Sequence, residues 1–170
     1  MRAFESAVLP HLDAAYTLAR YLLRDEDDAR DAVQDACLRA LKYFREPQVV
    51  DPRPWFLQIV RNRCHTLRGT SSARADATEY DDNTHSPPAE DDAGPELPPG
   101  ITPESVRNAV SQLPVKFREV LILREVQACS YEEIAQIVNA PVGTIMSRLS
   151  RARQRLRQAL VPGRAGEMLT

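Results

Sequence analysis

The sequence predicts an all-α protein made of two small helical domains joined by a flexible acidic linker. Apolar residues recur every three or four positions through residues 1–69 and 102–170, which is the spacing of amphipathic helices. Neither region shows the alternating pattern of a half-buried strand. Residues 70–101 are rich in Ser, Asp, Glu, Ala and Pro and contain few aliphatic side chains. They cannot bury enough apolar surface to offset the entropy of ordering, so we expect a disordered linker there.

The charge of the chain is divided unevenly among these three segments. The net charge of the 170 residues is only −2. Residues 1–69 carry 11 basic and 10 acidic side chains, residues 70–101 carry one and eight, and residues 102–170 carry ten and six. A basic C-terminal domain therefore comes after a strongly acidic linker, and its charge favours a polyanionic partner.

The N-terminal domain is predicted to hold three or four helices. The first spans residues 4–23, and Asp27 or Asp28 can cap the second. A third should begin near Pro52 to Trp55, because proline is favoured in a first turn. Its inward side chains are apolar, and its outward side is basic and polar, with Arg61, Asn62, Arg63 and His65. This basic side of the helix either binds a nucleic acid or is simply exposed to solvent.

The C-terminal domain is predicted to contain four helices. Thr102 and Pro103 form a helix start, and Pro114 ends that helix. Apolar residues from Phe117 to Val126 predict the next helix. The last two helices form a helix-turn-helix from Ser130 to Arg157.

The helix-turn-helix carries the clearest signals in the chain. Ser130 and Glu133 have the spacing of a capping box, while Asn139 and Pro141 predict a tight turn. In the second helix, the buried side is expected to comprise Ile145, Leu149, Ala152, Leu156 and Leu160. The opposite side carries Thr144, Ser147, Arg148 and Arg151. Residues 143–164 contain six arginines and no acid, a composition that favours docking in the major groove of DNA over a merely solvated surface.

The sequence argues against several other classes of protein. It contains no nucleophile and base at a meaningful spacing and no glycine-rich phosphate loop, so we predict a non-enzyme without a small-molecule substrate or cofactor. Cys37, Cys64 and Cys129 are odd in number and form no ligand pattern with the histidines, so we expect reduced thiols and no metal. No secretory or membrane-spanning pattern is evident, and we expect a cytoplasmic protein.

In their order along the chain, these segments resemble the extracytoplasmic-function (ECF) group of bacterial RNA polymerase sigma factors. LLRDEDDARDAVQDACLRALKYF, residues 22–44, resembles the second conserved region of this group. PRPWFLQIVRNRCHTLR, residues 52–68, resembles the segment that reads the minus-ten promoter element. Residues 113–157, from LPVKFREVLILRE to the end of the helix-turn-helix, resemble the fourth region, which reads the minus-35 element.

The resemblance implies a role for each set of residues. Docking on the clamp helices of core RNA polymerase is implied for Asp31, Gln34, Asp35, Leu38 and Arg39. Contact with the minus-ten element is implied for Tyr43 and Phe44, which open the base-capturing loop 43–50, and for Arg61, Asn62, Arg63 and His65. Contact with minus-35 DNA is implied for Thr144, Ser147, Arg148 and Arg151. Arg153, Arg155 and Arg157 are expected at DNA phosphates or the polymerase flap.

The resemblance also implies partners and leaves two questions open. Core RNA polymerase, promoter DNA and an anti-sigma factor, which could be membrane-bound, are the expected partners. The acidic linker either occupies a basic channel of the polymerase, through residues such as Asp81, Asp82, Asp91 and Asp92, or serves only as a spacer. Met146, Cys129, Asn139 and Thr66 depart from the usual pattern of the group, which affects the base preference and not the class. The alternative function is a helix-turn-helix regulator that binds operator DNA without polymerase.

Overall fold

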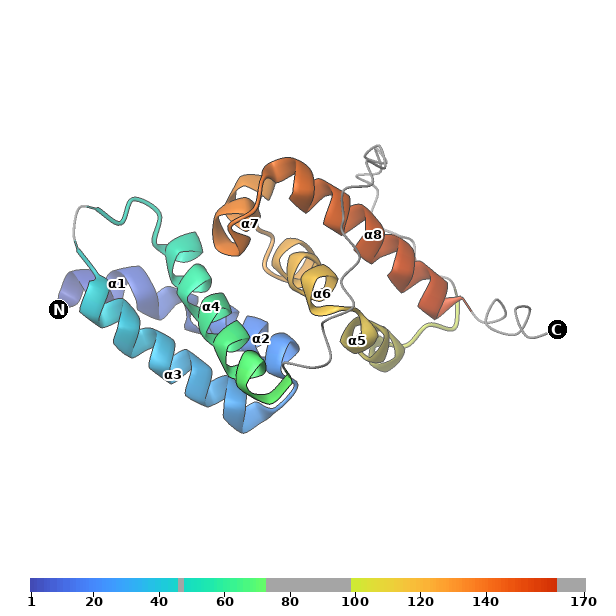
Figure 1. Ribbon diagram of the computed structural model, residues 1–170, viewed down its shortest axis with the longest axis horizontal. Coiled ribbons are helices and arrows are strands. Elements are labelled where there is room, and N and C mark those ends of the chain that lie inside the picture. The colour runs from blue at the N-terminus through green and yellow to red at the C-terminus, as the bar shows by residue number, and fades with distance from the viewer. Residues whose placement is uncertain (46–47, 73–98, 162–170) are drawn as a thin grey trace.

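The computed structural model describes residues 1–45, 48–72 and 99–161, and every regular element in these ranges is helical. The helices form two groups that lie side by side (Figure 1). We call helices α1–α4 the N-terminal module and helices α5–α8 the C-terminal module. The predicted all-α class is confirmed. The linker, including Asp81, Asp82, Asp91 and Asp92, lies outside the described residues for the most part.

The N-terminal module begins with α1 (Arg2–Val8), a 3₁₀ turn η1 (Leu9–His11) and α2 (Leu12–Leu23). The sequence predicted one continuous helix over residues 4–23, and this was wrong. Pro10 lies in the 3₁₀ turn, where its missing N–H and its ring interrupt an α-helix. The chain therefore changes from α1 to α2 through a short, tighter turn.

Helices α3 (Glu26–Tyr43) and α4 (Pro52–Ser72) complete this module. The N-cap of α3 is Asp25 and not Asp27 or Asp28, since the Asp25 carboxylate accepts a hydrogen bond of 2.9 Å from the backbone N–H of Asp28. Helix α4 begins at Pro52, as predicted, and continues to Ser72, past the domain boundary expected at residue 69.

One side of α3 consists of small residues that are fully buried. They are Ala29, Ala32, Ala36 and Ala40. This side packs against α2 and α4, which contribute larger side chains such as Leu18, Leu22 and Phe56. Because alanine adds only a methyl group beyond the backbone, the three helices approach one another closely, and the opposite side of α3 is left to solvent.

The C-terminal module comprises α5 (Pro103–Gln112), α6 (Val115–Leu121), a π-helical turn η2 (Ile122–Val126), α7 (Tyr131–Val138) and α8 (Val142–Leu160). Thr102 caps α5 and Pro103 opens it, as predicted. Val126 was expected on the buried side of a continuous helix, but it is 52% exposed. The π turn inserts extra backbone per turn and so rotates Val126 away from the core.

The helix-turn-helix has the local geometry that its sequence predicts. The Ser130 hydroxyl accepts a hydrogen bond of 3.1 Å from the backbone N–H of Glu133, and the Glu133 carboxylate accepts one of 3.4 Å from the N–H of Ser130. Asn139 ends α7 in the left-handed conformation, with φ of 59°. Ile145, Leu149 and Ala152 are buried on the inner side of α8, whereas Leu156 and Leu160, expected on the same side, are only partly buried.

Replacing Ser130 by alanine should lower the free energy of unfolding by about 1 kcal/mol, because an orphan N–H at the start of α7 loses its acceptor. Urea unfolding followed by circular dichroism would measure this. Ser130→Asp should restore most of the loss, since its carboxylate can cap the same N–H. An alanine variant as stable as the unchanged chain would contradict a stabilising role for this cap.

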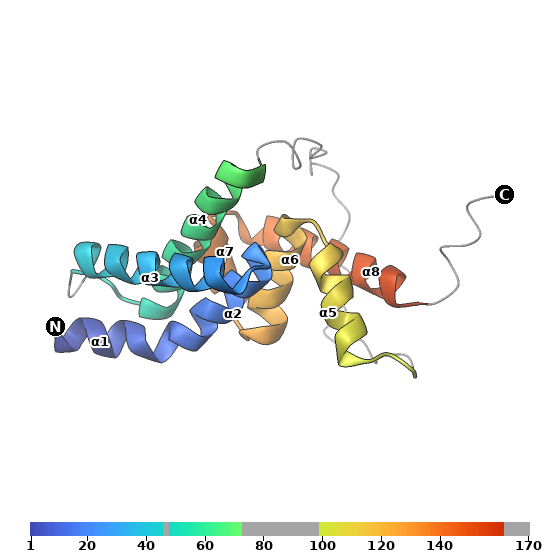
Figure 2. The ribbon, with the colours of Figure 1, turned by 90° about the horizontal axis from the view of Figure 1, so that it is seen from below.

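The two modules pack against each other, mainly through α4 on α7 and α2 on α6. Helices α4 and α7 lie together in both perpendicular views (Figures 1 and 2). Polar side chains cross this boundary. The Arg53 guanidinium donates to the backbone carbonyl of Gln127 and lies 3.4 Å from the sulfur of Cys129. The Gln127 side-chain amide donates to the carbonyl of Ala14 at 3.2 Å.

Candidate nucleic-acid interfaces

Helix α8 offers the first candidate surface. It runs along the outer edge of the C-terminal module (Figure 1), and its inner side is anchored on α6 and α7. Thr144, Ser147, Arg148 and Arg151 lie on one side of the helix, because residues spaced by three and four positions share a side, and all four are partly exposed. The structure therefore groups the residues that the sequence assigned to the major groove.

Two other predicted arginines of α8 already have partners within the protein. The Arg153 guanidinium donates two hydrogen bonds, of 2.7 and 3.1 Å, to the Glu125 carboxylate on η2. The Arg155 guanidinium lies over the ring of Phe117, 4.8 Å from its centre. The DNA contacts of Arg153 and Arg155 stay predictions, and the structure places both guanidinium groups against side chains of their own module.

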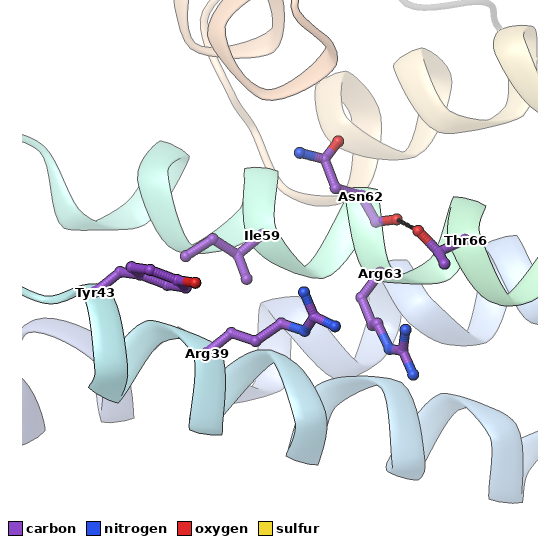
Figure 3. Close-up of a pocket in the computed structure, with 6 residues that line it drawn as sticks. All are labelled: Arg39, Tyr43, Ile59, Asn62, Arg63 and Thr66. Carbon is purple, nitrogen blue, oxygen red and sulfur yellow. Dashed lines mark hydrogen bonds between the residues drawn. The ribbon is translucent and has the colours of Figure 1, made fainter.

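A pocket between α3 and α4 is the second candidate surface (Figure 3). Its volume is about 220 Å³. Helix α3 contributes Arg39 and Tyr43, and α4 contributes the rest of the lining: Ile59, Asn62, Arg63 and Thr66. The Tyr43 side chain is 63% exposed, so one aromatic ring stands at the edge of a pocket rich in hydrogen-bond donors.

Asp35 connects the two arginines of this pocket. Its Oδ2 atom lies 2.9 Å from the Nε of Arg39 and 2.6 Å from the Nε of Arg63. The sequence assigned Asp35 and Arg39 to polymerase and Arg63 to DNA. The structure brings the three together, so the two predicted surfaces meet at this carboxylate. Two further residues line the pocket, Thr66 and Ile59. The sequence singled out Thr66 only as a departure from the usual pattern of the group, and it predicted that Ile59 faces inward.

Phe44 differs from its neighbour Tyr43 in its surroundings. Its ring makes edge-to-face contacts with Phe4, at 5.7 Å between ring centres, and with Trp55, at 6.0 Å. These contacts anchor the end of α3 onto α1 and α4, while Tyr43 remains exposed. A part of the predicted base-capturing loop, residues 46–47, lies outside the described residues.

The outward side of α3 is the predicted polymerase-docking surface. Asp31, Gln34 and Leu38 are exposed on it, and Leu38 is 67% exposed, which is unusual for a large aliphatic side chain. Leu41, one turn further along the helix, is 45% exposed. The predicted docking residues therefore share an accessible side of α3.

Arg61 and His65, also predicted to contact DNA, point instead to a carboxylate of the other module. Arg61 donates two hydrogen bonds of 3.0 Å to the two oxygens of Glu119 on α6. His65 Nε2 lies 2.8 Å from Oε2 of the same carboxylate, which as an ion can only accept, so this nitrogen is the donor. The Glu119 side chain is 1% exposed. We call Arg61, His65 and Glu119 the carboxylate cluster.

The electrostatics of this cluster result from its geometry. Burial by itself raises the pKa of Glu119, but the hydrogen bonds from His65 and Arg61 outweigh it and hold the pKa below its usual value. Cys64 is buried close by, and the pKa of its thiol is raised to about 12, first by burial and then by the charge of Glu119. Glu119 was missed in the sequence, where it reads as an exposed residue of an apolar helix.

Metal ligands and membrane-spanning helices are absent from the described part of the chain. Residues 1–45, 48–72 and 99–161 contain no group of His, Cys, Asp and Glu side chains suited to a metal ion. No helix among them has the length and apolar character needed to cross a membrane. Their three cysteines are free thiols, with Cys64 and Cys129 buried and Cys37 partly exposed.

Comparisons with known proteins agree with this arrangement. Residues 7–72 match the family described as sigma-70 region 2, and residues 104–156 match sigma-70, region 4. The chain is 31% identical to the RNA polymerase sigma-H factor of Pseudomonas aeruginosa, over 95% of this chain and 88% of that one. It is 32% identical to the ECF RNA polymerase sigma factor SigM of Mycobacterium tuberculosis, over 93% and 77%.

A solved structure is similar over nearly its whole length. It is the sigma factor RpoE in complex with the anti-sigma factor NepR from Bartonella quintana. The TM-score is 0.68 at 28% sequence identity, and the match covers 94% of this chain and 98% of that one.

Proposed function

This chain belongs to the ECF group of sigma factors, which direct bacterial RNA polymerase to promoters, and we propose that its two modules contact separate promoter elements. Matches to both conserved regions and to relatives over most of their length support membership. The observation that carries the proposal is that each module presents its own cationic surface, α8 in one and the α3–α4 pocket in the other. The chain works in the cytoplasm, together with core polymerase and promoter DNA.

Helix α8 reads the minus-35 element as duplex DNA. Its arginines Arg148 and Arg151 can donate to guanine edges or phosphates, and Thr144 and Ser147 can contact either groove atoms or the backbone. A helix with an anchored apolar side and a cationic outer side can enter the major groove without changing its own packing.

The α3–α4 pocket receives an unpaired base of the minus-ten element. The exposed ring of Tyr43 offers a stacking surface, and the guanidinium groups of Arg39 and Arg63 supply donors in the same pocket, while the Asn62 side-chain amide points away from the ring (Figure 3). Stacking of a base on an aromatic side chain contributes roughly 1–3 kcal/mol and offsets part of the cost of opening the duplex.

Replacing Tyr43 by alanine should therefore weaken binding of a minus-ten oligonucleotide to the polymerase-bound protein by about 5- to 150-fold. Tyr43→Phe keeps the ring and should bind within a factor of a few of the unchanged chain. Fluorescence anisotropy with a labelled single strand measures both. Equal loss in the two variants would show that the ring does not act by stacking.

The outward side of α3 docks on the clamp helices of core polymerase. Leu38→Ser removes the exposed leucine and should weaken core binding by roughly tenfold or more, since a side chain near the centre of an interface can contribute about 2 kcal/mol or more. Leu41→Ser is the matched control, because Leu41 is also exposed on α3 but lies outside the predicted docking set. Competition binding to purified core polymerase measures both, and equal effects would contradict this assignment.

The decisive test is reconstitution. The purified chain is mixed with sigma-free core polymerase and a promoter library, and transcript start sites are sequenced. Specific initiation supports the proposal. Binding to DNA without any initiation would instead favour the alternative function, an operator-binding regulator, which the family match disfavours.

An anti-sigma factor, soluble or membrane-bound, is the proposed restraint on this chain. The support is that the similar sigma factor RpoE is found in complex with the anti-sigma factor NepR. Co-purification from the native cell with a tagged chain tests this.

A further inference from the structure

The carboxylate cluster joins the two modules through a buried charge. Glu119 lies on α6 of the C-terminal module, and the groups that bind its carboxylate, Arg61 and His65, lie on α4 of the N-terminal module. Removing a carboxylate from water is costly unless strong partners replace the water. Here two arginine hydrogen bonds and one from histidine do so, and the fork of Arg61 fits both oxygens.

Contact with minus-ten DNA is implied for Arg61 and His65 by the family resemblance, so a role for their contact with Glu119 in DNA binding rests on the proposed function. Arg61 is 20% and His65 30% exposed, because the C-terminal module covers them. An ionised carboxylate presents anionic acceptor oxygens to a guanidinium, as a DNA phosphate does. Glu119 and a phosphate of the minus-ten strand would therefore compete for the same two donors.

The packed arrangement is also too small to contact both promoter elements at once. Elements centred near positions −35 and −10 are roughly 25 base pairs apart, which is about 85 Å along a duplex. A compact chain of 170 residues has a radius of gyration of only about 15 Å. The modules can therefore reach both elements only after they separate. The segment between α4 and α5 is long enough to allow this, since it can span up to about 100 Å.

We propose that Glu119 is an intramolecular latch that keeps the free chain closed and blocks Arg61 and His65 until polymerase draws the modules apart. Polar contacts from Arg53 and Gln127 close the same boundary. In the closed chain the outer side of α8 stays accessible while part of the minus-ten surface does not. The free protein then binds the single strand poorly, and binding to polymerase creates that affinity.

The test compares Glu119→Gln with Glu125→Gln in the full-length chain. Both variants remove one negative charge from the C-terminal module, but the Glu125 carboxylate binds Arg153 of its own module. Dyes placed at the exposed positions Lys42 and Gln158 through noncanonical amino acids report the distance between modules by energy transfer. Anisotropy reports binding of a minus-ten single strand without polymerase.

Glu119→Gln should lower the transfer efficiency and bind the strand roughly tenfold more tightly or better, whereas Glu125→Gln should match the unchanged chain. Adding Arg61→Ala to Glu119→Gln should abolish the gain in strand binding. If Glu119→Gln leaves both readouts unchanged, or if Glu125→Gln changes them equally, the latch is refuted.

Two controls keep the outcome interpretable. Circular dichroism checks that Glu119→Gln is folded, and if it is not, Gln127→Ala, which removes the contact to Ala14, should lower the transfer efficiency in its place. Unchanged transfer in that variant then counts against the latch. Initiation with core polymerase tests the proposed function separately: a chain that initiates normally but shows no effect of Glu119→Gln refutes the latch alone.

Discussion

Arg118→Ala is expected to destabilise the C-terminal module by about 3–5 kcal/mol, the largest stability effect that we predict for a single substitution. Arg118 is 1% exposed. Its guanidinium donates hydrogen bonds of 3.0 Å to the backbone carbonyls of Ser111 and Leu113. These carbonyls lie at the end of α5, where no helical N–H remains to satisfy them. Alanine would leave the buried Leu113 carbonyl without this donor, would leave the Ser111 carbonyl with Arg24 as its only side-chain donor among the described residues, and would open a cavity in place of the side chain.

Thermal unfolding measures this effect, and the melting temperature should fall by roughly 10 °C. The melting temperature of Arg118→Lys should lie between those of the unchanged chain and Arg118→Ala. An ammonium group keeps the charge but lacks the planar fork that reaches two carbonyls. Arg107→Ala is the matched control, since Arg107 is exposed on the adjoining α5 and should change stability by less than about 0.5 kcal/mol. An Arg118→Ala variant within about 1 kcal/mol of the unchanged chain would contradict this role.

The double variant Arg148→Ala, Arg151→Ala is expected to lower the affinity of the reconstituted polymerase for minus-35 DNA by about 30-fold or more. A good arginine contact to a base contributes roughly 1–3 kcal/mol. Each lost phosphate contact makes the negative slope of log affinity against log salt less steep by about 0.9. Both residues are partly exposed on the outer side of α8. Binding to a labelled promoter at several salt concentrations measures the loss and the slope together.

Arg153→Ala is the comparison for this variant. Because the Arg153 guanidinium is bound to Glu125, its removal should affect DNA binding less than removal of either outer arginine. Stability must be measured in parallel, since Arg153→Ala also breaks an ion pair. A larger loss of affinity in Arg153→Ala than in the double variant would show that the helix docks on a different side.

Local patterns in the sequence were sufficient to predict most of the helices. The capping box at Ser130, the turn at Asn139 and the start at Pro52 each depend on a few neighbouring residues, and each is confirmed. The errors also have local causes. Pro10 interrupts a helix whose apolar spacing continues through it, and the π turn at η2 shifts Val126 out of a register that the sequence alone shows as unbroken.

The contacts between modules could not be predicted, because they join residues far apart in the sequence. Glu119 is 54 residues from His65 and 58 from Arg61, and no spacing rule connects them. For the same reason the sequence assigned Arg61 and His65 to DNA without showing that they have a competing partner. The sequence did not predict the α3–α4 pocket, since its lining depends on how two helices pack. It assigned Tyr43, Asn62 and Arg63 to minus-ten DNA but Arg39 to polymerase.

The run of buried alanines on α3 has a mechanical consequence. Because alanine has no side-chain rotamers, this side of α3 has little freedom to repack against α2 and α4, and we expect the N-terminal module to move as a stiff body. A large protein that binds one side of the module would then also fix the orientation of its opposite side. Little conformational entropy is lost on assembly, because the parts that must be aligned are already aligned before the encounter.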